Sequence, residues 1–294
     1  MHDTPTGGIA VQRRSPEAVF ALLGDDIRVA ILRALGETPD EAVPFAELRA
    51  RADVADSGQF NYHLGKLRGA FVRKTDAGYE LTYAGRQVVG AMYAGTYTAT
   101  ASVDTVTVDG DCPLCGGAVV ARYAEEHALL DCTDCGEWHN EFPFPPGSLD
   151  QFERDELPAA FDRWMRHVFS GVVDGFCHTC AGRMEGRLET DGAGLAGMPA
   201  DAVFECARCG STVRSSGMSP AFFHPAVEGF LYDHGFDSRT APSWMLGGVG
   251  LPEATLLSES PPRLAVTFTS SGESLTAVVE ADTTVSDVER GPAE

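Results

Sequence analysis

All eight cysteines of this sequence occur in Cys-x-x-Cys pairs, a spacing that places two thiolates across one tight turn. Two such pairs can close a tetrahedron of sulfur ligands around one Zn²⁺ ion. The predicted ligands are Cys112, Cys115, Cys132 and Cys135 of a first zinc ribbon, and Cys177, Cys180, Cys206 and Cys209 of a second. Because four protein ligands leave no coordination position for a substrate, we expect both Zn²⁺ ions to be structural.

The two predicted sites differ in their spacing. Sixteen residues separate Cys115 from Cys132, whereas twenty-five separate Cys180 from Cys206. The longer insert is rich in glycine, which indicates an extended loop within the second ribbon. Its glycines are Gly182, Gly186, Gly192, Gly194 and Gly197.

Disulfides and histidine ligands are the alternatives at these cysteines. Disulfides need an oxidising compartment, but the first ten residues lack the basic and apolar segments of a signal peptide. His139 and His178 lie near the cysteines and could replace a ligand, but each site already has four thiolates. We therefore predict sulfur ligands throughout.

Length and composition indicate a soluble protein with a sizeable core. The chain has 294 residues, of which 44% are hydrophobic, enough for two or three domains. No apolar run approaches the ~18 residues needed to span a membrane, so we expect no membrane association and a cytoplasmic location. The net charge is −21, and the 22 basic residues include two lysines. This acidic, lysine-poor composition is similar to that of proteins from salt-accumulating archaea and predicts a halophilic protein.

The acidic residues are distributed unevenly along the chain. Residues 1–96 carry 11 basic and 12 acidic residues, so nearly all of the net charge lies in the rest of the chain. Within this segment, residues 57–75 contain no carboxylate. They hold Lys66, Arg68, Arg73 and Lys74. If any surface of the protein faces nucleic-acid phosphates, we expect it to be this one.

Local signals predict a series of helices in the same segment. Ser15 before Pro16 is a helix start, because the hydroxyl can cap the helix and proline suits its first position. Gly24 and Gly36 end the first two predicted helices, and residues 45–54 fit a third.

The fourth predicted helix begins near Asp56 or Ser57 and has a polar outer face. Its inward face holds Phe60, Leu64 and Leu67. The opposite face then carries Tyr62 and Lys66. Residues 71–82 predict a β-hairpin that turns at residues 76–78. Three helices, a fourth with a polar outer face and a basic hairpin together predict a winged helix-turn-helix.

Two stretches of this segment also resemble a known family. ALLGDDIRVAILRAL resembles the opening helices of ArsR-type regulators. FNYHLGKLRGAFVRKTDAGYELTYAGRQVV is similar to the recognition helix, wing and final helix of haloarchaeal ArsR-like winged-helix regulators, which often carry C-terminal zinc ribbons. One departure is that metal-sensing members use cysteines in the DNA-binding domain, whereas this chain has none before Cys112.

The resemblance implies a homodimer that binds double-stranded DNA, with the fourth helix in the major groove and the hairpin along the backbone. The candidate DNA contacts are Ser57, Gln59, Asn61, Tyr62, His63, Lys66, Arg68, Arg73 and Lys74. For His63, at the edge of the apolar stripe, a packed histidine is an equal alternative. Lys66 and Arg68 could be ordinary solvated charges, but their confinement to this segment favours a DNA contact.

Further elements are predicted after the hairpin. A fifth helix follows Thr82, and its apolar face either packs on the first helix or, as we favour, forms a dimer. That face holds Val88, Val89, Met92 and Tyr93. A strand is expected before Cys112, an amphipathic helix over residues 157–171, and a helix over residues 227–234. Two late strands, LAVTFT and SLTAVVEA, should join at Ser271.

These elements predict an α+β chain, with an N-terminal winged helix-turn-helix followed by two zinc ribbons, helices and short antiparallel strands. The predicted parts are a disordered tail (1–14), the winged helix-turn-helix (15–98), the first ribbon (99–147), a spacer helix (148–172), the second ribbon (173–216), a helix and strand hairpin (217–282) and an acidic tail (283–294).

The sequence favours a DNA-binding transcriptional regulator over an enzyme. It contains no glycine-rich phosphate loop and no group of residues typical of a nucleophile and its base. The alternatives are a zinc-ribbon protein-protein adaptor in transcription, and a thiol- or zinc-responsive sensor in which the second, longer site loses metal first. No small-molecule effector can be identified from these residues.

Overall fold

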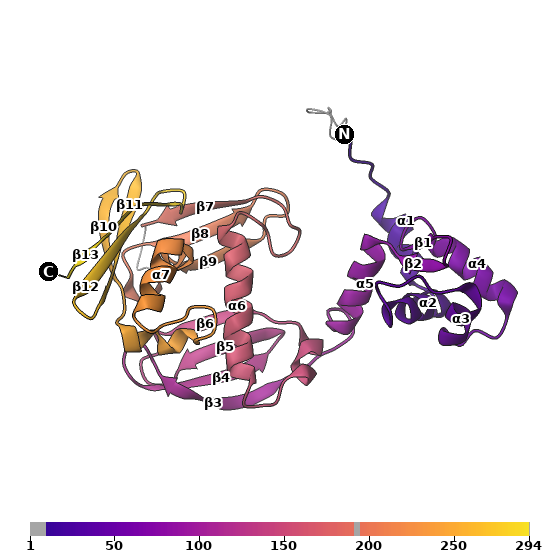
Figure 1. Cartoon of the computed structure of the whole chain (residues 1–294), viewed down its shortest axis with the longest axis horizontal. Coiled ribbons are helices and arrows are strands. Elements are labelled where there is room, and N and C mark those ends of the chain that lie inside the picture. The colour runs from indigo at the N-terminus through magenta and orange to yellow at the C-terminus, as the bar shows by residue number, and fades with distance from the viewer. Residues whose placement is uncertain (1–9, 191–194, 294) are drawn as a thin grey trace. The chain divides into compact units, whose positions relative to one another are not determined.

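A computed structural model describes residues 10–190 and 195–293, which form a mixed α+β chain with several antiparallel sheets (Figure 1). The chain divides into an N-terminal unit, Met1–Ala99, and a C-terminal unit, Thr100–Glu294. Residues 1–9 of the predicted N-terminal tail lie outside the described residues, and residues 10–14 form no helix or strand. The fold class agrees with the expectation at this coarse level.

Besides a short 3₁₀ helix (Ala21–Leu23), the described part of the N-terminal unit contains five α-helices and one hairpin. They are α1 (Pro16–Phe20), α2 (Asp26–Gly36), α3 (Phe45–Arg51), α4 (Ser57–Leu67), β1 (Val72–Lys74), β2 (Tyr79–Leu81) and α5 (Tyr83–Tyr93). Side-chain oxygens cap four of the helices: Ser15 before α1, Asp25 before α2, Asp56 before α4 and Thr82 before α5. These elements match those expected from the capping and hydrophobic patterns.

Residues of α2 and α4 form the centre of the N-terminal core. Ile31 and Leu35 of α2 are buried together with Phe60 and Leu64 of α4. The hairpin is attached to this core because Val43 and Tyr79 exchange backbone hydrogen bonds of 2.8 and 2.9 Å.

The predicted dimer face of α5 lies partly in this core. Val89 is only 5% exposed and packs so closely on α2 that a Cβ on Gly36 would lie 2.6 Å from its Cγ1. Val88 and Met92 are partly buried against the same core, whereas Tyr93 is exposed. The structure therefore favours packing for most of this face, but the helix contacted is α2, whereas the expected alternative was packing on the first helix.

The C-terminal unit begins with a four-stranded antiparallel sheet, followed by a long helix. The strands are β3 (Val103–Asp111), β4 (Ala118–Ala124), β5 (His127–Cys132) and β6 (His139–Pro143), in the order β3-β4-β5-β6. A 3₁₀ helix (Pro146–Gln151) leads to α6 (Leu157–Val173), the predicted amphipathic helix.

A three-stranded sheet and a helix come next. The strands are β7 (Met184–Glu189), β8 (Asp201–Cys206) and β9 (Thr212–Ser216), in that order. A short 3₁₀ helix (Leu195–Gly197) precedes β8, and two more (Ser219–Phe223 and Ser243–Val249) precede and follow α7 (Pro225–Asp233) in the sequence.

The chain ends in four strands rather than the two predicted. They are β10 (Glu253–Glu259), β11 (Pro262–Ser270), β12 (Glu273–Val279) and β13 (Val285–Pro292), paired in chain order. The assignment of residues 283–294 to an acidic tail was wrong, because β13 pairs along β12 and partly buries Val285 and Val288 against the core. Its charged residues include Arg290, which lies over the ring of Phe230 and contacts Asp233 and Glu273.

Helix α6 contacts both sheets that precede and follow it. Phe161 packs against Phe144 with ring centroids 5.0 Å apart, and Phe169 packs against Phe204 at 5.6 Å. The predicted spacer helix is thus a packed element, with Phe161 fully buried. The three-stranded sheet and the last four strands also share one core, so no core boundary falls at residue 217.

Within the described part of the chain, every helix is too short or too polar to cross a membrane.

Candidate functional site

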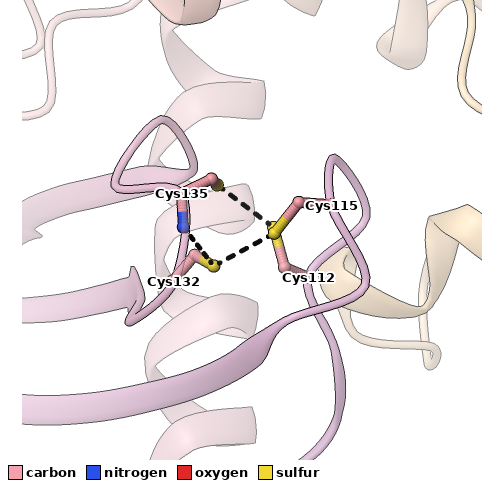
Figure 2. Close-up of side chains that lie close together, drawn as sticks. All are labelled: Cys112, Cys115, Cys132 and Cys135. Atoms are coloured by element: carbon pink, nitrogen blue, oxygen red, sulfur yellow. Dashed lines mark hydrogen bonds between the residues drawn. The ribbon is translucent and has the colours of Figure 1, made fainter.

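Two turns bring the first four cysteines together. Cys112 and Cys115 lie in the turn between β3 and β4, while Cys132 ends β5 and Cys135 lies in the turn before β6. Figure 2 shows the four side chains converging, with Sγ–Sγ distances of 3.9 Å for Cys112 and Cys135 and 3.5 Å for Cys115 and Cys132.

The other four cysteines form a second cluster of the same kind. Cys177 and Cys180 precede β7, Cys206 ends β8, and Cys209 lies in the turn before β9. Sγ–Sγ distances are 3.7 Å for Cys177 and Cys209 and 3.5 Å for Cys180 and Cys206. All eight thiols are free rather than joined in disulfides.

Both clusters fit a metal ion with four sulfur ligands. Metal–sulfur bonds of about 2.3 Å in a tetrahedron place neighbouring sulfurs about 3.8 Å apart, close to the distances above. Within each cluster all four sulfurs lie within 4.8 Å of one another, so each group could hold one ion. In the described residues the two groups contain cysteine alone, so the predicted ligands come together in the predicted pairs and His139 and His178 are not among them.

Backbone N–H groups favour the thiolate form at one sulfur of each cluster, whereas burial and the neighbouring thiols raise the pKa of Cys115 and of Cys180 to about 12. The N–H groups of Cys135 and Asp134 lower the pKa of Cys132 to about 6. In the second cluster, the N–H groups of Cys209 and Arg208 lower the pKa of Cys206 to about 6. A lowered thiol pKa means that more thiolate is available at neutral pH.

The two clusters lie on equivalent scaffolds, which we call the first module (residues 112–143) and the second module (residues 177–216). Each consists of a Cys-x-x-Cys turn, two strands, a second Cys-x-x-Cys turn and a third strand. The connection between the first two strands has two residues in the first module (125–126) and eleven in the second (190–200). This difference of nine residues accounts for the whole difference in cysteine spacing.

The first module also depends on side chains that the sequence analysis missed. Trp244 is 5% exposed in the core of this module, and its Nε1 donates to the carbonyl of Asp109 over 3.3 Å. On α6, Asp162 is fully buried, accepts a bond from the N–H of Ser243, and lies 2.9 Å from Arg166. Burial raises the pKa of Asp162. No short-range sequence signal links these residues, because Ser243 is 81 positions from Asp162.

The outer face of α4 exposes most of the predicted DNA contacts. The side chains of Ser57, Gln59, Asn61, Tyr62 and Lys66 are all exposed. Tyr62 is 60% exposed, and the ammonium of Lys66 lies 5.3 Å from the centre of its ring. All five side chains are therefore accessible, and Tyr62 and Lys66 lie next to one another on the helix.

His63 lies apart from this surface. Its side chain is only 13% exposed, and Nδ1 lies 3.1 Å from the carboxylate of Asp25, which caps α2. This environment favours the packed-histidine alternative over a phosphate contact.

The hairpin exposes its basic side chains, with one in an ion pair. Arg73 Nε lies 2.5 Å from Glu80 on the opposite strand. Arg68, which follows α4, and Lys74 are exposed.

Comparison with known families places both units in recognised sequence groups. A family model described as Domain of unknown function (DUF7347) matches residues 16–92, and one described as Domain of unknown function (DUF7351) matches residues 109–285. No curated protein and no solved structure matches the chain. Because the second model spans more than half of the sequence and includes both cysteine clusters, the chain belongs to the DUF7351 family.

Proposed function

We propose that this protein is a DNA-binding transcriptional regulator that acts as a homodimer. Its N-terminal unit would be a winged helix-turn-helix, with α4 as the recognition helix and β1-β2 as the wing. The C-terminal unit would hold two structural Zn²⁺ ions in its zinc ribbons and would serve assembly or signal sensing.

The observation that carries this proposal is the outer face of α4. This helix has eleven residues and no carboxylate, in a chain with a net charge of −21. Amide, phenol and ammonium groups of Gln59, Asn61, Tyr62 and Lys66 are exposed on it together. These are groups that hydrogen-bond base edges or phosphates, and an α-helix fits the major groove.

The neighbouring elements support the same assignment. Helix α3 ends six residues before α4 begins, and the hairpin follows α4 directly. Arg68, Arg73 and Lys74 extend the exposed basic character from the helix end to the hairpin. A recognition helix with an adjacent basic wing can contact a groove and the flanking backbone.

The sulfur clusters support a structural role for the metal. Zinc, when bound, would supply folding free energy, on the order of 10 kcal/mol on the scale of small zinc domains. Cys112, Cys115, Cys132 and Cys135 would hold one ion, and Cys177, Cys180, Cys206 and Cys209 the other.

The first test is selection of sheared genomic DNA by the full-length protein in concentrated KCl, compared with a Tyr62→Ala/Lys66→Ala variant. We expect the wild type to enrich a short palindromic site and the variant to lose it. A folded, metal-loaded wild type that enriches no site would contradict the proposal and favour the protein-protein adaptor.

A second test separates binding from stability. A Cβ on Gly65, in the exposed face of α4, would meet no atom within 4 Å, and the same holds for Gly90 in α5. Alanine at either position should therefore stabilise the unit by about 0.5–1 kcal/mol, because glycine is a poor helix former. If α4 enters a groove, Gly65→Ala should also weaken DNA binding severalfold, whereas Gly90→Ala should leave it unchanged. Equal affinity of both variants for the selected site would count against α4 as the docking helix.

A further inference from the structure

The cysteine end of the second module carries exposed aromatic and cationic side chains. Phe176, next to Cys177, is 62% exposed, and Arg183 and Arg208 are both exposed. No carboxylate oxygen of the described residues lies within 4.0 Å of either guanidinium. These three residues form what we call the 176/183/208 patch.

Backbone contacts hold the three residues of the patch together. Phe176 and Arg183 face each other in an antiparallel bridge. The carbonyl of Arg183 accepts a bond of 3.0 Å from the N–H of Ala207. A Cβ on Gly182 would lie 3.0 Å from the Cβ of Arg208, so this arginine lies against the turn that precedes Arg183. The patch ends at Glu185 and Glu205, which pair with each other on β7 and β8, two residues beyond Arg183 and Ala207.

Arg183 and Arg208 belong to the five arginines of the C-terminal unit that have no carboxylate of the described residues within 4.0 Å, whereas six have one. The C-terminal unit has 11 basic and 31 acidic residues. Several of its other arginines are neutralised: Arg187 lies 2.9 Å from Glu189 and 3.5 Å from Glu205, and Arg263 lies 3.0 Å from Glu280. In so acidic a unit, Arg183 and Arg208, which start from adjacent backbone segments, offer unpaired guanidinium donors to an anion.

The first module shows that the metal site does not require these charges. Its equivalent positions, counted from the cysteines, are Asp111, Ala118 and Asp134. The backbone there is the same: Asp111 pairs with Ala118, and the carbonyl of Ala118 accepts a bond of 3.0 Å from the N–H of Thr133. A Cβ on Gly117 would touch Asp134, as one on Gly182 would touch Arg208. One scaffold thus carries two carboxylates in one module and two guanidiniums in the other.

We infer that the 176/183/208 patch binds the sugar-phosphate backbone of DNA. Arg183 and Arg208 donate to phosphate oxygens, for which the guanidinium fork is suited. Phe176 contacts the apolar face of a deoxyribose. The equivalent end of the first module, with Asp111 and Asp134, repels the same backbone. This inference rests on the proposed DNA binding and adds a second contact surface to it.

The test measures binding of a fluorescent DNA duplex by full-length protein over a KCl series, with the fold checked by circular dichroism at each concentration. Each lost phosphate contact lowers the slope of log affinity against log salt by about 0.9. Arg183→Gln/Arg208→Gln should therefore reduce the slope by about 2, with a loss on the order of tenfold near 0.2 M KCl that vanishes toward 1 M. Phe176→Ala should weaken binding without changing the slope.

A matched control removes two arginines that already have carboxylate partners. Arg187→Gln/Arg263→Gln changes the net charge equally and should leave the slope unchanged. A slope change as large as that of Arg183→Gln/Arg208→Gln would overturn the inference, because net charge alone would then explain the effect.

The Tyr62→Ala/Lys66→Ala variant separates this inference from the proposed function. If this variant loses binding while Arg183→Gln/Arg208→Gln retains the wild-type slope, the patch inference is overturned and the α4 proposal stands. If the Tyr62→Ala/Lys66→Ala variant retains DNA binding and Arg183→Gln/Arg208→Gln abolishes it, the patch is supported and the α4 proposal is overturned. A folded wild type that binds no duplex overturns both.

Discussion

The two cysteine modules of the C-terminal unit share a scaffold but differ in what they expose. Both have three antiparallel strands, two Cys-x-x-Cys turns, and two buried, one intermediate and one exposed sulfur ligand. They differ in the connection between the first two strands and in the charges at the cysteine end. The strands and turns that bring four sulfurs together are thus common to both modules. The modules differ in the length of a connection, and in charges, that four converging sulfurs do not require.

The largest expected effect comes from removing one ligand of either cluster. Cys112→Ser and Cys206→Ser should each reduce bound metal from two ions per chain to one, because only one cluster is affected. The lost folding free energy, on the order of 10 kcal/mol, should unfold much of the C-terminal unit. Metal analysis and calorimetry would measure both effects, and the transition of the N-terminal unit is the internal control. A variant that keeps two ions and its melting temperature would contradict a structural role for that cluster.

Gradual removal of metal by a chelator sharpens the same comparison. Because the nine extra residues of the second module lie in the strand connection and not at the sulfurs, we expect both clusters to release metal over the same range of chelator concentration. A colorimetric release assay on the wild-type protein would compare them, because both ions should then leave in one phase, and alkylation of the released cysteines would identify any cluster that loses metal first. Much earlier release from the second module would instead support the zinc-responsive sensor.

A smaller effect is expected where the first module depends on a distant side chain. Trp244→Ala should destabilise the C-terminal unit by about 3–5 kcal/mol, since it removes a buried aromatic ring and its hydrogen bond to Asp109. The neighbouring Met245 is exposed, so Met245→Ala is a matched control expected to change stability by no more than about 0.5 kcal/mol. Denaturant unfolding of the two variants would test this prediction. Similar losses of unfolding free energy in Trp244→Ala and Met245→Ala would contradict the buried position of Trp244.

The sequence was most informative where one short pattern sufficed. Cys-x-x-Cys spacing identified both clusters and their pairing. Capping residues such as Ser15, Asp56 and Thr82 located three of the helix starts in the N-terminal unit. These features are local, so tertiary contacts had little opportunity to alter them.

Prediction failed where distant segments meet. Strand β13 was missed because the charged residues Glu289 and Arg290 interrupt its apolar pattern, although Val285 and Val288 pack against the core. Arg290 itself lies over the ring of Phe230, a contact that no short sequence pattern indicates. Trp244 gave no sign that it packs in a module beginning more than 100 residues earlier. The 176/183/208 patch could have been found by aligning the two modules on their cysteines, a comparison that relates Phe176 to Asp111 and Arg208 to Asp134.

The smallest expected effect concerns the residue after the second cysteine of each turn. All four such residues have positive φ, but three are glycine (Gly116, Gly136 and Gly210) and one is Ala181. Alanine in this left-handed region is strained by about 1–2 kcal/mol, partly offset by the greater freedom of glycine in the unfolded chain.

Exchanging these residues between the modules should therefore change stability in opposite directions. A Cβ on Gly116 would meet no atom within 4 Å, so Gly116→Ala tests backbone strain alone and should destabilise the unit by about 1 kcal/mol. Ala181→Gly, at an exposed position with φ of 51°, should stabilise it by about 0.5–1 kcal/mol. Chemical denaturation of the metal-loaded protein would measure both changes. If Ala181→Gly were destabilising, the alanine Cβ would contribute contacts that outweigh the strain, and the first turns of the two modules would not be energetically equivalent.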